Sequence, residues 1–178
     1  GLKALLNYAG IEETDVMLES IGFNQVEAFT TGQSNIIVGY KANEPVQLKA
    51  LGEDLTTLFV ADYVDLASNG IITNETLMAE EPELVEAFNR AISKGIQFVL
   101  DDPDQAYEIC KKFVENLDEA DEAVQMEVLA VSSEFYGEGN IGHSSPEAWQ
   151  NMYDVLLSMG LIGEDVEVDE AYTNEFLP

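Results

Sequence analysis

The sequence predicts an α/β fold that begins with a parallel-sheet lobe and continues into a largely helical C-terminal half. Three β-rich runs alternate with short helical patterns between residues 15 and 61, and this order of elements is typical of parallel α/β units. Beyond residue 72 the apolar residues recur only at helical spacing. With 178 residues, 46% of them hydrophobic, the chain is long enough to bury a core.

Three helices and three strands are predicted in the first part of the chain. Helices are expected over residues 2–9, 25–29 and 43–50, with glycines at positions 10, 32 and 52 as stop signals. Asn43 is a capping candidate for the third helix, whose first turn accepts Pro45. Strands are expected over 15–21, 35–40 and 55–61, and the continuous apolar run 35–40 is typical of a strand buried on both faces.

The second part begins with one more extended stretch, over residues 64–72, and is then predicted to be helical. A start signal at 73–76 is followed by helices from Pro82, over 103–114, over 119–135 and over 146–159. The helical aromatic residues are expected in the core: Phe88, Phe98, Phe113, Phe135 and Trp149. An acidic tail over 169–178 offers Tyr172, Phe176 and Leu177 for docking.

The charge balance excludes some partners. The chain has 35 Asp and Glu against 7 Lys and Arg, a net charge of −28, whereas binding to nucleic acid or an anionic membrane requires clustered Lys and Arg. The acidity is compatible with solubility at high salt or with simple colloidal repulsion. No apolar run reaches about 18 residues, and Gly1 does not begin a charged region followed by an apolar one. As given, this chain is therefore expected to contain neither a membrane span nor a signal peptide.

No catalytic, metal or cofactor site is predicted. The lone His143 lies in a turn-rich loop, and Gly137–Gly139 lies between two helices instead of following a strand as a phosphate loop would. Cys110 is the only cysteine, which excludes an internal disulfide. The adjacent acidic pairs lack the alternating spacing of a calcium loop. The chain is therefore not expected to be an enzyme.

Polar and aromatic residues near predicted strand ends are candidates for ligand binding. Tyr40 and Tyr63 lie at the carboxyl ends of predicted parallel strands, Asn43 and Glu44 open the helix between them, and Gln47 follows. Ligands of open α/β sheets bind at such ends and at helix N-termini. The alternative is that Asn43 only caps the helix and the tyrosines only pack, and the residues alone leave both interpretations open.

Several sequence strings resemble one family. These strings are Ile21-Gly-Phe-Asn-Gln-Val26, Tyr40-Lys-Ala-Asn-Glu-Pro-Val-Gln-Leu48, Asp62-Tyr-Val64, Ser68-Asn-Gly-Ile-Ile-Thr-Asn-Glu75, Asp102-Pro103 and Thr173-Asn-Glu-Phe-Leu-Pro178. Together they resemble the substrate-binding proteins related to fungal hydroxymethylpyrimidine-phosphate synthase. The resemblance implies a solute-binding component of an ABC importer for a thiamine-precursor pyrimidine or riboflavin.

The resemblance also implies a fold and a location. It implies a partial, two-lobed fold like that of type II periplasmic binding proteins. Residues 1–64 would form the α/β second lobe, and residues 65–178 would return to the first lobe and complete its helical part. The protein would work outside the cytoplasm, in the periplasm or lipid-anchored at the cell surface, with an ABC permease as partner.

Roles for the site residues follow from the resemblance. Tyr40 and Tyr63 would stack on the heterocycle, Glu44 and Asn43 would hydrogen-bond its polar edge, and Gln25 and Gln47 would add secondary contacts. One alternative is a biosynthetic enzyme like the synthase, although the fungal enzymes use a cysteine-rich motif and this chain has only one cysteine. A second alternative is an acidic helical interaction domain.

Overall fold

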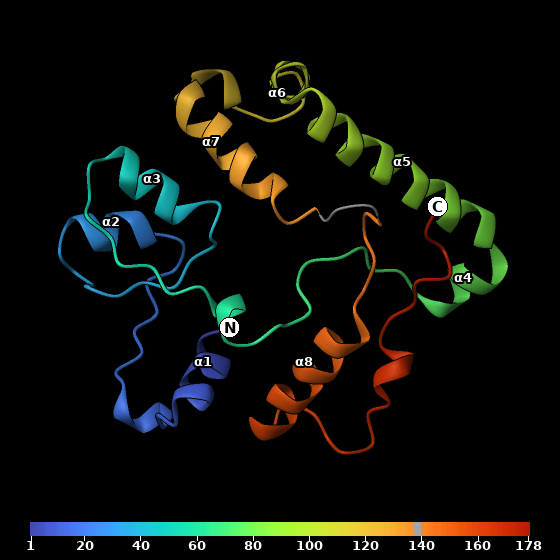
Figure 1. The fold of residues 1–178 in the computed structure, drawn as a ribbon, viewed down its shortest axis with the longest axis horizontal. Helices are drawn as coiled ribbons and strands as arrows, with labels where there is room; N and C mark the ends of the chain where they lie inside the picture. The colour runs from blue at the N-terminus through green and yellow to red at the C-terminus, as the bar shows by residue number, and fades with distance from the viewer. Residues whose placement is uncertain (137–139) are drawn as a thin grey trace. The chain divides into compact units, whose positions relative to one another are not determined.

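The fold is described by a computed structural model for residues 1–136 and 140–178. Within these ranges the chain forms α-helices, short 3-10 helices and connecting segments, and no β-strand (Figure 1). Gly137–Gly139, considered above as a phosphate loop, lies outside the described residues. The fold expected from the sequence, a parallel-sheet lobe like that of type II periplasmic binding proteins, is therefore wrong for this structure.

The predicted strands fail because an extended segment becomes a strand only when a neighbour pairs with its backbone. Residues 17–21, 35–40 and 53–59 have no regular secondary structure, and neither has the extended stretch 64–74. Several of their apolar side chains also stay in solvent: Ile36 is 84% exposed and Ile72 is 93% exposed. The expected burial of residues 35–40 on both faces is therefore not found.

The helices of the first part begin and end close to their predicted positions. They are α1 (Leu2–Ala9), α2 (Gln25–Thr30) and α3 (Glu44–Ala50). Gly10 ends α1 in the left-handed conformation, with φ of 67°, and its N–H donates to the carbonyls of Leu6 and Asn7. Glycine takes this conformation without a steric penalty, so the predicted stop signal is confirmed.

The helices of the second part are confirmed with shorter ends. They are α4 (Glu75–Glu80), α5 (Pro82–Asp101), α6 (Pro103–Cys110), α7 (Glu122–Ser133) and α8 (Pro146–Ser158). Four of them begin after a residue whose side-chain oxygen accepts a backbone N–H of the first turn: Asn74, Asp102, Asp121 and Ser145. These caps satisfy donors that a helix start leaves unpaired. Local signals therefore determine where these helices start.

The described residues divide into two compact units. Unit 1 contains residues 1–16, 59–94 and the described part of 138–178, and unit 2 contains residues 17–58 and the described part of 95–137. The boundary on the C-terminal side of Lys94 falls inside α5. The predicted division into lobes at residue 64 stays a prediction.

Unit 1 contains α1, α4, α8 and the docked C-terminal segment. The 3-10 helix Val168–Glu170 contacts α8 (Figure 1). The ring of Tyr172 stacks on Trp149 with centroids 5.2 Å apart. Asn174 accepts the N–H of Ser144 at 2.8 Å and donates to its carbonyl at 3.0 Å. The tail that the sequence predicted to be available for docking is thus bound within its own unit.

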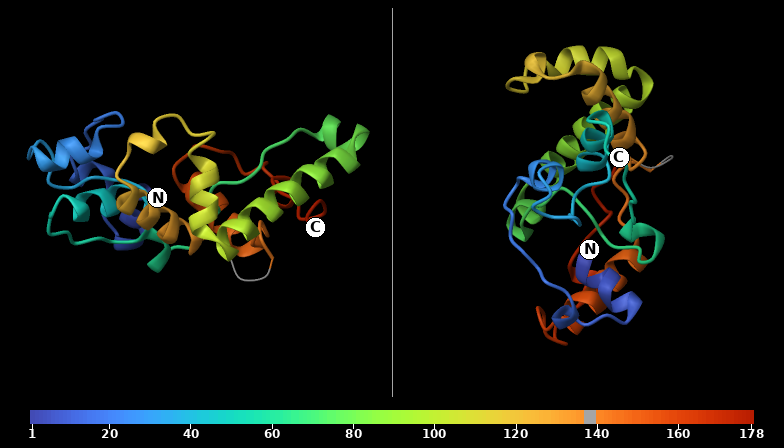
Figure 2. Two further views of the ribbon diagram at one scale, coloured as in Figure 1. Left: turned by 90° about the horizontal axis from the view of Figure 1, so that it is seen from above. Right: turned by 90° about the vertical axis from the view of Figure 1, so that its left-hand side faces the viewer.

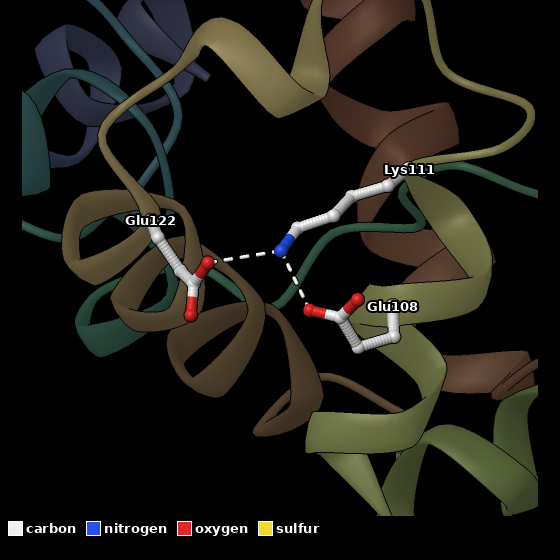
Figure 3. Close-up of polar contacts among 3 residues, drawn as sticks. All are labelled: Glu108, Lys111 and Glu122. Carbon is white, nitrogen blue, oxygen red and sulfur yellow. Dashed lines mark hydrogen bonds and ion pairs between the residues drawn. The ribbon is translucent and has the colours of Figure 1, made fainter.

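Unit 2 is organised around α3, which contacts α2 on one side and α7 on another (Figure 1 and Figure 2). Val46 and Leu48 of α3 are buried together with Ala28 of α2. Helices α6 and α7 are joined by Lys111, whose Nζ lies 2.6 Å from a Glu108 oxygen and 2.9 Å from a Glu122 oxygen (Figure 3). Hydrogen bonds to these two carboxylates raise the pKa of Lys111 above its ordinary value.

The aromatic residues of the helices are less buried than predicted. Phe113 is 82% exposed, and Phe88, Phe98 and Phe135 are each exposed by more than a third of their surface. Most of the buried hydrophobic side chains in the described part are small, alanines above all. Helical spacing predicted which face is apolar, but in this structure too few neighbouring elements cover those faces.

None of the helices in the described part is both long and apolar enough to cross a membrane.

The charge of the chain predicts that salt stabilises the fold. With 35 carboxylates and 7 basic side chains, most negative charges have no positive partner, and their mutual repulsion opposes compaction. The melting temperature should therefore rise by several degrees as NaCl increases from about 0.01 M to about 0.15 M, because the Debye length falls from about 30 Å to about 8 Å. Thermal unfolding followed by circular dichroism measures this, with sucrose as the uncharged control. A melting temperature that falls or stays constant with NaCl contradicts the prediction.

Candidate ligand-binding site

A depression of about 380 Å³ lies in unit 2, at the starts of α2 and α3. Its lining is polar apart from one aromatic and one aliphatic side chain and includes amide, hydroxyl and carboxylate groups. The lining residues are Phe23, Asn24, Gln25, Val26, Glu27, Thr30, Asn43, Glu44 and Gln47. Its volume falls within the range of small-molecule sites, although such sites are usually lined mostly by apolar and aromatic side chains.

Glu44 is the buried acidic residue of this depression, with 6% of its surface exposed. One carboxylate oxygen accepts the backbone N–H of Tyr40 at 2.7 Å, and the other accepts the side-chain amide of Asn43 at 3.1 Å. The N–H of Asn43 also donates to the carbonyl of Tyr40 at 2.9 Å. These bonds fix the turn that leads into α3.

Gly39 makes room for the Glu44 side chain. A Cβ atom at position 39 would lie 2.7 Å from Glu44 Cδ and closer still to Oε2. Any larger residue therefore moves the carboxylate away from the Tyr40 N–H. Glycine at position 39 avoids this displacement of the Glu44 side chain.

Asn43 and Gln47 form a linked pair of amides on the first turn of α3. The Nε2 of Gln47 donates to Oδ1 of Asn43 at 2.6 Å. Asn43 occupies the N-cap position, as predicted, but its side chain accepts no backbone N–H of the helix. Its hydrogen bonds go instead to Glu44 and Gln47, which also line the depression. Simple capping therefore does not account for this asparagine.

The structure brings together four of the six residues predicted to bind a ligand. Gln25, Asn43, Glu44 and Gln47 all line the depression. Tyr40 is not among the lining residues that the structure describes; its side chain is 70% exposed, and only its backbone N–H contacts Glu44. The binding roles themselves stay predictions.

Tyr63, the sixth candidate, belongs to unit 1. Its ring packs on Tyr8, with centroids 5.3 Å apart and an angle of 59° between the planes. This is an ordinary tilted aromatic pair. In unit 1, packing describes Tyr63 better than ligand stacking.

Sequence reasoning missed an aromatic residue in the lining. Phe23 is 100% exposed and lies beside Asn24 at the start of α2. The signal was present in the string Ile21–Val26, which carried the family resemblance but from which only Gln25 was selected. A single phenylalanine in a turn follows no helical or strand period, so periodicity gave it no weight.

Lys41 connects the turn before α3 to the end of α7. Its Nζ lies 2.7 Å from a carboxylate oxygen of Glu134 and 5.1 Å from the centroid of the Phe135 ring. Both contacts lie within unit 2. The turn is thus held on one side by Glu44 and on the other by α7.

Other residues considered in the sequence lie outside this depression. His143 lies in the loop before α8, where its N–H donates to the carbonyl of Asn140 at 3.1 Å, as expected for a loop histidine. Cys110 is exposed at the end of α6. Among residues 1–136 and 140–178, no group of three or more His, Cys, Asp or Glu side chains is placed to hold a metal ion.

The chain belongs to the NMT1/THI5 like family, whose sequence profile matches residues 1–106. The resemblance drawn from the sequence strings is thereby confirmed. Two relatives of this chain are named as binding proteins.

This chain is 35% identical to the riboflavin-binding protein RibY of Chloroflexus aurantiacus, over 99% of this chain and 52% of the relative. It is 26% identical to the formylaminopyrimidine-binding protein of Halalkalibacterium halodurans, over 97% of this chain and 54% of the relative.

A third relative is an enzyme. The chain is 22% identical to 4-amino-5-hydroxymethyl-2-methylpyrimidine phosphate synthase of Legionella pneumophila, over 98% of this chain and 55% of the relative. The chain thus spans about half the length of the curated relatives it matches.

The close approach of Gly39 and Glu44 predicts energetic coupling between substitutions at these two positions. Gly39→Ala should lower the free energy of unfolding by about 1.5–3 kcal/mol, because the new methyl group displaces Glu44 from its charge-assisted hydrogen bond. In a Glu44→Ala background the same change should cost almost nothing, because the obstructing carboxylate is gone. Urea unfolding of the four proteins of this cycle measures both values.

Gly70→Ala is the matched control for this cycle, because a Cβ at Gly70 meets no atom within 4 Å and Gly70 has no positive φ. Its effect should stay within about 0.5 kcal/mol. Equal effects of Gly39→Ala in both backgrounds would refute the proposed contact.

Proposed function

We propose that this chain is part of the solute-binding component of an ABC importer, and that the depression in unit 2 holds a small flat heterocycle such as riboflavin or an aminopyrimidine. The carrying observation is that one depression combines the exposed ring of Phe23 with four amide side chains and two carboxylates. Flat ligands are bound by stacking on an aromatic face and by a few fixed polar groups.

The polar groups suit the edge of such a ring. Asn and Gln side chains each offer a donor and an acceptor, and carboxylates accept N–H donors. The hydrogen bond between Gln47 and Asn43 fixes the orientation of two of these amides before a ligand arrives. Groups held in place in this way lose little conformational freedom on binding, which favours affinity.

The names of two relatives agree with a binding role. RibY and the formylaminopyrimidine-binding protein are both named for a bound heterocycle, and the binding-protein relatives have higher identity to this chain than the synthase does. A location outside the cytoplasm and an ABC permease as partner are parts of this proposal. The biosynthetic enzyme remains the alternative, and it is favoured only by the similarity to the synthase.

Phe23→Ala should weaken heterocycle binding about tenfold or more, because the ligand loses its stacking surface. The measurement is isothermal titration of riboflavin and of 4-amino-5-hydroxymethyl-2-methylpyrimidine into the full-length protein. Phe113→Ala is the matched control, since Phe113 is also strongly exposed and lies in unit 2 but does not line the depression. Equal affinities of the two variants would exclude the depression as the binding site, and binding of neither compound would overturn the proposed function.

Gln25→Ala tests the polar contacts separately from the stacking surface. Loss of one hydrogen-bonding amide should weaken binding by about 3- to 10-fold, equivalent to about 0.5–1.5 kcal/mol. Gln97→Ala is a control in the same unit: its side chain donates to Asp101 at 2.8 Å, and it does not line the depression. The two variants should have the same melting temperature within about 2 °C, and a loss of affinity shared by both would contradict this assignment.

A further inference from the structure

We infer that the depression selects heterocycles without a phosphate group. This inference rests on the proposed function and specifies the class of ligand. The ionisable side chains in the described lining are Glu27 and Glu44, and no Lys, Arg or His accompanies them. A ligand that enters therefore meets negative charge and neutral amides.

The charge of Glu44 is not balanced by its hydrogen-bond donors. The carboxylate accepts the N–H of Tyr40 and the side-chain amide of Asn43, and both donors are uncharged groups. With 6% of its surface exposed, this carboxylate is also shielded from water, which strengthens its field in the depression. A second anion close to it is disfavoured.

The lysine nearest in sequence to Glu44 is held by an acidic residue outside the lining. Lys41 Nζ lies 2.7 Å from Glu134 and above the ring of Phe135. Lys111, a second lysine of unit 2, lies between Glu108 and Glu122 (Figure 3). These contacts direct two lysine charges toward protein carboxylates and not toward a ligand phosphate.

The helix starts around the depression are also occupied by acidic residues. Glu27 lies in the first turn of α2, and Glu44 lies in the first turn of α3. A carboxylate in the first turn offsets the partial positive charge of the helix N-terminus. The partial positive charge at these helix starts, which would otherwise attract a phosphate, is therefore already offset by the protein's own carboxylates.

The consequence is discrimination between a heterocycle and its phosphate ester. A phosphate monoester adds a charge of about −1.5 to −2 near pH 7, and the chain as a whole carries a net charge of −28. The negative charges of the lining and of the whole chain both repel this phosphate group. Unphosphorylated heterocycles, neutral or positively charged, are the expected ligand class.

The test compares two pairs of compounds by titration calorimetry of the full-length protein. The pairs are riboflavin with riboflavin 5′-phosphate and 4-amino-5-hydroxymethyl-2-methylpyrimidine with its phosphate. In at least one pair the unphosphorylated compound should bind, and its phosphate should bind about tenfold or more weakly at low salt. The ratio should shrink as NaCl increases, because salt screens the repulsion.

Glu27→Gln and Glu127→Gln separate the lining from the net charge. Both changes remove one negative charge from unit 2, but Glu127 is exposed on α7 and does not line the depression. Glu27→Gln should reduce the ratio by about threefold, whereas Glu127→Gln should leave it nearly unchanged. Glu27→Lys should reduce it further.

The outcomes distinguish this inference from the proposed function. Equal binding of both members of a pair to the unmodified protein overturns the selectivity and leaves the proposed function standing. Equal effects of Glu27→Gln and Glu127→Gln also overturn it, because the lining then has no specific role. Binding of no member of either pair overturns both.

Discussion

The hydrogen bond from the Tyr40 N–H to the buried Glu44 carboxylate is the interaction on which the candidate site depends. It closes the turn before α3 and favours glycine at position 39, where a Cβ would displace the carboxylate. Breaking it would leave a buried charge with fewer donors, which costs more than an exposed hydrogen bond contributes. The turn therefore determines where α3 starts and where Asn43 presents its amide.

Helix α3 transmits this constraint to the rest of unit 2. It contacts α2 and α7, and its buried Val46 and Leu48 anchor it there. Helix α2 supplies the other side of the depression, and Lys41 ties the turn to Glu134 at the end of α7. Two short helices of six and seven residues are too short to be stable alone, so the site exists only while these tertiary contacts hold.

Helix ends could be predicted from the sequence because nearby residues determine them. Strands could not, because they depend on pairing with a distant segment. Gly10 acts as the helix stop that the sequence indicated, because the carbonyls that its N–H satisfies lie within a few residues. The run 35–40 was expected to be a buried strand, yet it finds no pairing partner among the described residues. Strand formation depends on a neighbour that may be far away in sequence, and an apolar run does not specify one.

The same distinction applies to the candidate site. Asn43, Glu44 and Gln47 lie within one turn of a helix, so their proximity followed from the sequence. Tyr63 was selected for two reasons, its place in the string Asp62-Tyr-Val64 and a predicted parallel sheet that would have set its strand end beside that of Tyr40; without the sheet only the first reason is left. Phe23 was overlooked because a single ring in a turn follows no helical or strand period. In the structure it is exposed and lines the depression beside the start of α2.

The acidic residues that favour the local structure also determine the character of the depression. Glu27 and Glu44 lie in the first turns of α2 and α3, where a carboxylate is favourable, and both residues line the same depression. At these two helix starts the stabilising group is charged, and neither has the neutral side-chain cap that Asn74 and Ser145 provide at α4 and α8. Amides then have to provide most of the recognition, and because an amide both donates and accepts, they suit a ring whose edge alternates donors and acceptors. If the depression binds the proposed heterocycle, the same two glutamates influence both the start of the helices and the choice of ligand.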